Sequence, residues 1–145
     1  MRQGASEKGL PAKPLPRELC MAAVEMMIVD DDVELADLLR LQLEAKGFEC
    51  KVAYNGTQAI QMYQDNRPAI ILLDVNMPGI DGFVVARKIR GQSGSKTKPN
   101  IIMLTTKHSS EDVLKALENG ANDYAVKPVQ MPLLLDKIKK AMAAI

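Results

Sequence analysis

From Glu25 onward, short apolar runs alternate with amphipathic stretches, and this repeat constrains the fold more than any other feature. Parallel sheets bury both faces of their strands, so their strands read as short, continuous apolar runs. Five such runs occur, at residues 26–29, 50–53, 69–73, 101–104 and 124–126. The stretches between them place apolar residues at helical spacing, as in Leu35, Leu39 and Leu43. The pattern predicts an α/β fold: a doubly wound, five-stranded parallel sheet with helices on both faces.

Glycines mark the expected helix ends. Gly47, Gly91 and Gly120 follow the first, third and fourth helical stretches. Glycine adopts the left-handed conformation that commonly terminates a helix. We therefore expect helices to stop at these three positions.

The first 22 residues lack the alternation and contain Pro11, Pro14 and Pro16. We predict that residues 1–22 are a disordered tail, either native or an expression remnant, and that residues 23–145 are one domain.

Composition excludes several classes of function. The 19 Lys and Arg residues nearly balance the 18 Asp and Glu residues, so no broad attraction to nucleic acid or membrane is expected. Cys20 and Cys50 form neither a disulfide framework nor a zinc motif. No apolar run reaches the roughly 18 residues of a membrane span. We expect a cytoplasmic protein without direct nucleic-acid or membrane partners.

Polar residues follow four of the predicted strands. They are Asp30 to Asp32, Asp74, Thr105 with Thr106, and Lys127 with Pro128. Doubly wound sheets bind ligands outside the carboxyl ends of their strands. These residues should therefore share one edge of the sheet and form the functional site.

The aspartates predict a metal site. Asp30, Asp31 and Asp74 would repel one another unless a cation or a proton offsets their charge. Carboxylate oxygens, with the backbone carbonyl of Asn76, suit Mg²⁺. Asp32 is assigned to capping the following helix.

Lys127 and Thr105 extend this site. A lysine ammonium and a threonine hydroxyl could hold the oxygens of a phosphoryl group on Asp74. A carboxylate, a metal, a lysine and a hydroxyl together are typical of phosphoryl transfer.

Four segments, MIVDDD, IILLDVNMPGIDG, IIMLTT and DYAVKPV, occur in an order and spacing similar to those of response-regulator receiver domains of two-component signalling. The resemblance covers about residues 25–144. It implies the flavodoxin-like strand order 2-1-3-4-5. It also suggests a single-domain, chemotaxis-regulator-like protein, although a receiver cut from a longer regulator or hybrid kinase remains an alternative.

The resemblance implies a role for each motif position in the chemistry. Asp74 would be the phosphoacceptor, and Lys127 would hold the phosphoryl group. Asp31 would bind Mg²⁺ directly, Asp30 partly through water, and Asn76 through its carbonyl.

The resemblance also implies a switch. Thr105 would supply its hydroxyl, Tyr124 would be the aromatic ring that rotates, and a cis peptide would precede Pro128. A histidine kinase or histidine phosphotransfer protein would donate the phosphoryl group. A downstream protein would then bind the face of the fourth helix, fifth strand and fifth helix, and the chain would catalyse only its own phosphorylation and dephosphorylation.

Three other functions share part of this pattern. An aspartate-nucleophile phosphatase of the haloacid dehalogenase type needs a second aspartate where Asn76 stands. A flavin-binding protein needs a phosphate-binding loop after the first strand, whereas this loop is acidic. A pseudo-receiver usually lacks the phosphoacceptor or the acidic pair, and both are present.

Overall fold

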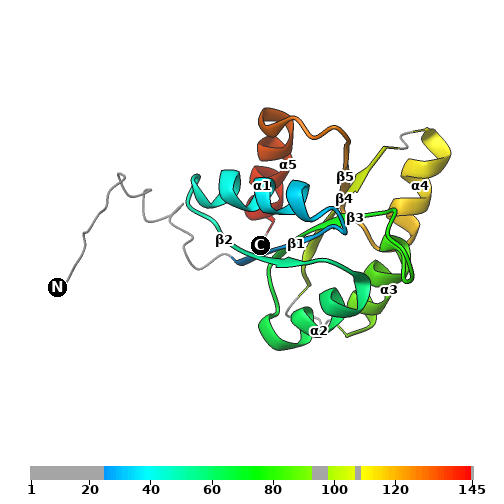
Figure 1. Cartoon of the computed structure of the whole chain (residues 1–145). Helices are drawn as coiled ribbons and strands as arrows, with labels where there is room; N and C mark the ends of the chain where they lie inside the picture. Colours follow the sequence, from blue (N-terminus) through cyan, green and yellow to red (C-terminus); the bar gives the residue numbers. More distant parts are fainter. Residues whose placement is uncertain (1–24, 93–97, 107–108, 145) are drawn as a thin grey trace.

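Five parallel strands form one sheet in the order β2-β1-β3-β4-β5 (Figure 1). The computed structural model describes residues 25–92, 98–106 and 109–144. The strands are β1 (Glu25–Val29), β2 (Glu49–Ala53), β3 (Ile70–Asp74), β4 (Asn100–Thr105) and β5 (Asp123–Val126). The helices are α1 (Val33–Glu44), α2 (Gly56–Asn66), α3 (Gly82–Gln92), α4 (Ser110–Glu118) and α5 (Met131–Ala143). The predicted fold and strand order are confirmed. The predicted tail, residues 1–22, lies outside the described residues.

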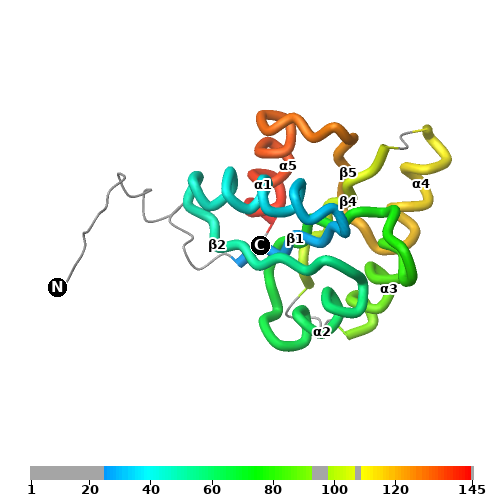
Figure 2. The backbone as a smooth tube through the Cα atoms, viewed as in Figure 1, coloured from blue at the N-terminus to red at the C-terminus, as the bar shows by residue number. Residues whose placement is uncertain are grey.

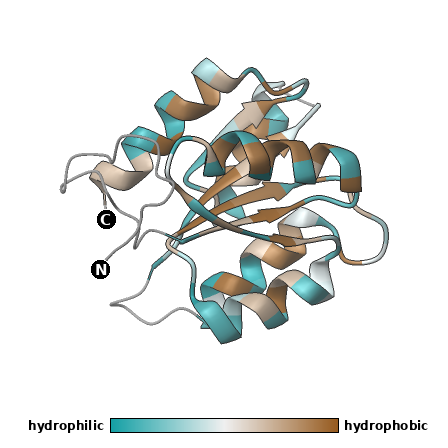
Figure 3. Ribbon diagram, turned by 60° about the vertical axis from the view of Figure 1, so that its left-hand side comes forward, coloured by the Kyte–Doolittle hydropathy of each residue, from teal (hydrophilic) through white to brown (hydrophobic). Residues whose placement is uncertain are grey.

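Helices cover both faces of the sheet. The α1 and α5 helices lie on one face, and α2, α3 and α4 lie on the other (Figures 1 and 2). The first face is closed by Leu39 and Leu43 of α1 together with Leu134 and Ile138 of α5. Apolar strands fill the middle layer between the helices (Figure 3). No helix in the described part of the chain is long and apolar enough to span a membrane.

The expectation that all five strands are buried is wrong for β2 and β5. Burial alternates along β2, with Glu49 and Lys51 exposed and Cys50 and Val52 half-buried, and in β5 only Ala125 is buried. The cause is the strand order, which places β2 and β5 at the two edges of the sheet. An edge strand has one face on the core and the other partly in water, so it alternates.

Two of the three predicted helix ends are correct. Gly47 and Gly120 have φ values of 101° and 105°, which L-residues rarely adopt. The prediction at Gly91 is wrong, because α3 continues through it to Gln92. The α2 helix instead ends at a non-glycine residue, Arg67, with φ 47°. The Arg67 guanidinium lies over the Tyr63 ring and donates to the Gln92 carbonyl, which holds this conformation.

Gly82 allows α3 to begin directly against the end of β3. A Cβ at this position would meet the Asp74 carbonyl and lie 2.8 Å from the Val75 Cα. We expect Gly82→Ala to lower the free energy of unfolding by about 1–3 kcal/mol, because backbone must move to admit the methyl group.

Urea unfolding would measure this effect, and Gly91→Ala is the matched control. A Cβ at Gly91 has nothing within 4 Å, so this helical glycine should accept alanine with no loss of stability. Equal stabilities for the two variants would contradict the close approach at Gly82.

Candidate functional site

Strand register brings the predicted site residues together at one edge of the sheet. Asp74 is paired with Leu104, so the end of β3 lies beside Thr105. Thr105 in turn pairs with Val126, the residue before Lys127. The Lys127 backbone N–H donates to the Thr105 carbonyl over 2.8 Å. Three adjacent strands thus present a carboxylate, a hydroxyl and an ammonium group side by side.

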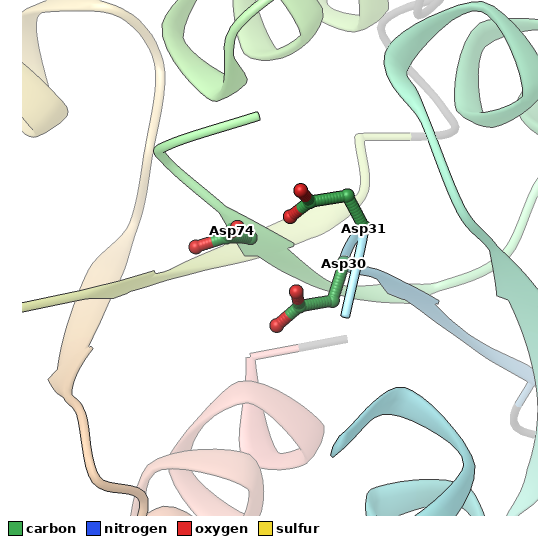
Figure 4. A group of neighbouring side chains, drawn as sticks. All are labelled: Asp30, Asp31 and Asp74. Atoms are coloured by element: carbon green, nitrogen blue, oxygen red, sulfur yellow. The ribbon is translucent and has the colours of Figure 1, made fainter. Parts of the chain in front are cut away.

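Three aspartates converge at this edge. Asp30, Asp31 and Asp74 each offer a carboxylate oxygen, and these oxygens lie within 4.8 Å of one another (Figure 4). Asp30 and Asp74 are buried, with 0% and 3% of their surface exposed, whereas Asp31 is exposed. The group therefore faces solvent through Asp31.

Lys127 bridges the two buried carboxylates. Its Nζ lies 2.9 Å from Asp30 Oδ2 and 2.9 Å from Asp74 Oδ1. The peptide bond between Lys127 and Pro128 is cis. Three carboxylates against one ammonium leave an excess of two negative charges when all four groups are ionised.

This environment perturbs the titration of Asp74. Burial is the largest cause, and with the negative charges of Asp30 and Asp31 it raises the pKa of Asp74 to about 6, although the hydrogen bond from Lys127 acts in the opposite direction. Burial alone would lower the pKa of Lys127, but its hydrogen bonds to Asp74 and Asp30 outweigh this and raise it. Lys127 is therefore charged at neutral pH, and Asp74 is mostly ionised.

The acidic group fits a hard divalent cation. Its donors are all carboxylate oxygens, and its excess negative charge is what a bound cation relieves. Asn76, two residues after Asp74, is exposed in the loop that follows β3. Its carbonyl as a metal ligand stays a prediction.

The helix after β1 begins beside these carboxylates. Asp32 caps α1, since its Oδ1 accepts from the Leu35 N–H over 3.1 Å. Its predicted capping role is confirmed. The Asp32 N–H in turn donates to Asp30 Oδ1 over 2.9 Å. Both oxygens of Asp30 are thus engaged, one by Lys127 and one by this N–H.

Thr105 and Tyr124 border a common cavity of about 170 Å³ beneath α4, called here the α4 cavity. Thr105 is buried and Tyr124 is half-buried. Other lining residues include Asn76, Val113 and Ala116. The predicted switch residues therefore adjoin one space next to the acidic group.

Sequence reasoning missed two residues near Tyr124. The Lys137 ammonium of α5 lies 5.1 Å from the centroid of the Tyr124 ring and 3.0 Å from Asp123 Oδ1. Lys137 and Asp123 are 14 positions apart, on a helix and a strand. Asp123 lies in the DYAVKPV segment, but no motif includes Lys137 or pairs the two residues.

Comparison with known proteins identifies the family. Residues 26–139 match the model of the response regulator receiver domain. The chain belongs to this family. Its receiver fold matches solved structures, among them Vibrio cholerae chemotaxis protein CheY4, with a TM-score of 0.76 and 31% identity over 81% of this chain and 98% of that one. The signal receiver domain of a histidine kinase from Syntrophus aciditrophicus has a TM-score of 0.75 and 31% identity, covering 84% of this chain and 92% of that one.

A curated relative is longer. The DNA-binding response regulator MtrA of Mycolicibacterium paratuberculosis is 39% identical over 114 residues, which cover 79% of this chain and 49% of MtrA. The receiver thus spans about half the length of the curated relatives it matches. Accepting a phosphoryl group is the general role of receiver domains, so family membership favours this role over the haloacid dehalogenase and flavin-binding alternatives.

Proposed function

We propose that Asp74 accepts a phosphoryl group in a magnesium-dependent reaction and that phosphorylation changes the protein-binding surface of the receiver. The observation that carries this proposal is the position of Asp74. Its buried carboxylate belongs to the group of three aspartates, and its Oδ1 forms a salt bridge of 2.9 Å with the Lys127 Nζ. A histidine kinase or a histidine phosphotransfer protein would be the phosphoryl donor.

In the proposed transfer, an oxygen of the Asp74 carboxylate forms a bond to phosphorus as the bond from phosphorus to the imidazole nitrogen of the donor breaks. The imidazole keeps the electron pair and takes up a proton. Bound magnesium would offset the negative charge of the phosphoryl oxygens. Lys127 contributes a second positive charge from the end of β5, at the same edge of the sheet, and its ammonium holds the Asp74 carboxylate in place.

The contacts of Asp30 support different modes of Mg²⁺ binding by the three aspartates. Asp30 already accepts bonds at both carboxylate oxygens, from Lys127 and from the Asp32 N–H. Asp31 is exposed. We therefore assign direct binding of Mg²⁺ to Asp31 and Asp74, a partly water-mediated contact to Asp30, and a carbonyl contact to Asn76.

The proposed switch begins at Thr105, whose hydroxyl would move toward the phosphoryl oxygens and open space for the ring of Tyr124. The α4 cavity, which both residues border, supports this assignment. The output surface would be the face of α4, β5 and α5. Its exposed apolar side chains, Leu114, Val126 and Leu133, suit contact with a downstream protein.

The setting of the receiver also belongs to the proposal. We favour a domain of residues 23–145 that follows a tail of residues 1–22. It would act in the cytoplasm as a single-domain regulator without direct nucleic-acid contact. It would catalyse only its own phosphorylation and dephosphorylation. CheY4, of which this chain covers 98%, supports the single-domain arrangement. MtrA, named as DNA-binding, supports the alternative of a receiver within a longer regulator.

The test is the intact mass of the protein after incubation with acetyl phosphate and magnesium. We expect one labile phosphoryl adduct, absent without magnesium and absent from Asp74→Ala. Asp65→Ala, at an exposed position of α2, is the matched control and should retain the adduct. If wild-type protein forms no adduct and binds no beryllium fluoride with magnesium, the chain is a pseudo-receiver and the proposal is wrong.

A further inference from the structure

Tyr124 lines two separate hollows. One is the α4 cavity. The other is an open groove of about 470 Å³ between β5 and α5, called here the α5 groove. Its lining includes Tyr124, Val126, Leu133, Lys137 and Lys140. The strand that carries Tyr124 lies between the two helices (Figure 1). Tyr124 therefore borders a hollow next to α4 and another next to α5.

On the side of α5, Lys137 contacts the Tyr124 ring. Its ammonium lies 5.1 Å from the ring centroid, within the range of a cation–π interaction. The same ammonium lies 3.0 Å from Asp123 Oδ1, and this oxygen also accepts the Tyr124 N–H over 2.8 Å. One carboxylate thus fixes both the ammonium and the backbone that carries the ring. Side chains of Lys137 and Asp123 keep only 28% and 29% of their surface exposed, which limits competition from water.

We propose that Lys137 is a positioning residue that holds Tyr124 beside α5 and so opposes the turn of its ring into the α4 cavity. This inference rests on the proposed function, since it gives Tyr124 the part of the switch aromatic. Asp123 restrains the Lys137 ammonium, so the ring must leave this contact when it turns inward.

A contact made only in the outward state reduces the affinity for any ligand that favours the inward state. A phosphoryl group on Asp74, or beryllium fluoride in its place, is such a ligand. An exposed cation–π contact corresponds to a factor of about 2 to 5 in an equilibrium constant. Lys137 would thus lower the fraction of phosphorylated protein that adopts the inward state.

The experiment measures beryllium fluoride binding to the full chain, with magnesium, by fluorine NMR of protein that contains 3-fluorotyrosine. The chain has three tyrosines, and Tyr124→Phe identifies the resonance of Tyr124. For Lys137→Gln we expect tighter binding by about 2- to 5-fold, and a Tyr124 resonance shifted toward its bound position before ligand is added. Asp123→Asn, which releases the ammonium, should act in the same direction, and Lys137→Arg should resemble wild type.

Lys140→Gln is the matched control, because it removes the same charge from the same groove three residues farther along α5. Loss of positive charge alone would weaken the binding of the anionic beryllium fluoride, whereas we expect Lys137→Gln to strengthen it. In a Tyr124→Leu background, Lys137→Gln should no longer change the affinity.

Three outcomes would overturn the inference: unchanged or weaker binding by Lys137→Gln, an equal gain in Lys140→Gln, or a gain that persists in Tyr124→Leu. The proposed function fails differently, because wild-type protein would then bind no beryllium fluoride at all.

Discussion

Lys127→Met is expected to slow phosphoryl uptake from acetyl phosphate by roughly 100-fold, the usual effect of removing one charge-stabilising group from a phosphoryl or acyl transfer site. Lys127 holds Asp30 and Asp74 at 2.9 Å each. Without it, bound magnesium would be the remaining positive charge among the three carboxylates and the incoming phosphoryl group. The pKa of Asp74 should also rise further, since the hydrogen bond that lowers it is gone.

The rate would be followed by intact mass at saturating magnesium, together with a thermal melt that confirms folding. Lys140→Met, at an exposed position of α5, is the matched control and should react like wild type. Equal rates for the two variants would remove Lys127 from the transfer step and leave it a structural partner of Asp30.

Asp74→Asn is expected to stabilise the metal-free protein at pH 7 by on the order of 2 kcal/mol. Because the pKa of Asp74 is raised from 3.8 to about 6 on folding, the folded state binds its proton more tightly than the unfolded state does. The stability from this group is fully present below pH 3.8 and is lost as pH rises through about 6. Asparagine does not ionise, so the variant avoids this loss.

Urea unfolding at several pH values would measure the difference. The advantage of Asp74→Asn should shrink as pH falls below 6, and also when magnesium is added, since the cation binds and stabilises the wild-type carboxylates. Asp136→Asn, at an exposed position of α5, should change little. A variant that is less stable than wild type at pH 7, or whose advantage grows on acidification, would contradict the burial of an ionised Asp74.

The sequence was sufficient to predict which residues meet at the edge of the sheet that carries the site, because the strands are parallel and their carboxyl ends share one edge. Once β3, β4 and β5 are recognised, the residues that follow them must meet, and Asp74, Thr105 and Lys127 do. The position of each strand end is set by where the apolar run stops, so the predicted strands agree with the structure to within one residue at either end.

Other features could not be predicted, because they depend on the neighbours in space. The exposure of β2 follows from its place at the edge of the sheet, not from its own residues. Glycine is common just after a helix, but Gly91 lies within α3, with open space where a Cβ would be. The pairing of Lys127 with Asp30 and the contact of Lys137 with Tyr124 both require a strand and a distant element to be placed first.

The hydrogen bond from the Lys127 N–H to the Thr105 carbonyl links the backbone of the two residues directly at the site. If the Thr105 hydroxyl moves toward a phosphoryl oxygen, as proposed, we expect part of the displacement to reach the peptide group of Lys127 through this hydrogen bond. The responses of the two residues to the phosphoryl group should then be coupled. A substitution that makes the end of β4 or of β5 more mobile should weaken the binding of the phosphoryl group and also reduce the conformational change proposed at α4.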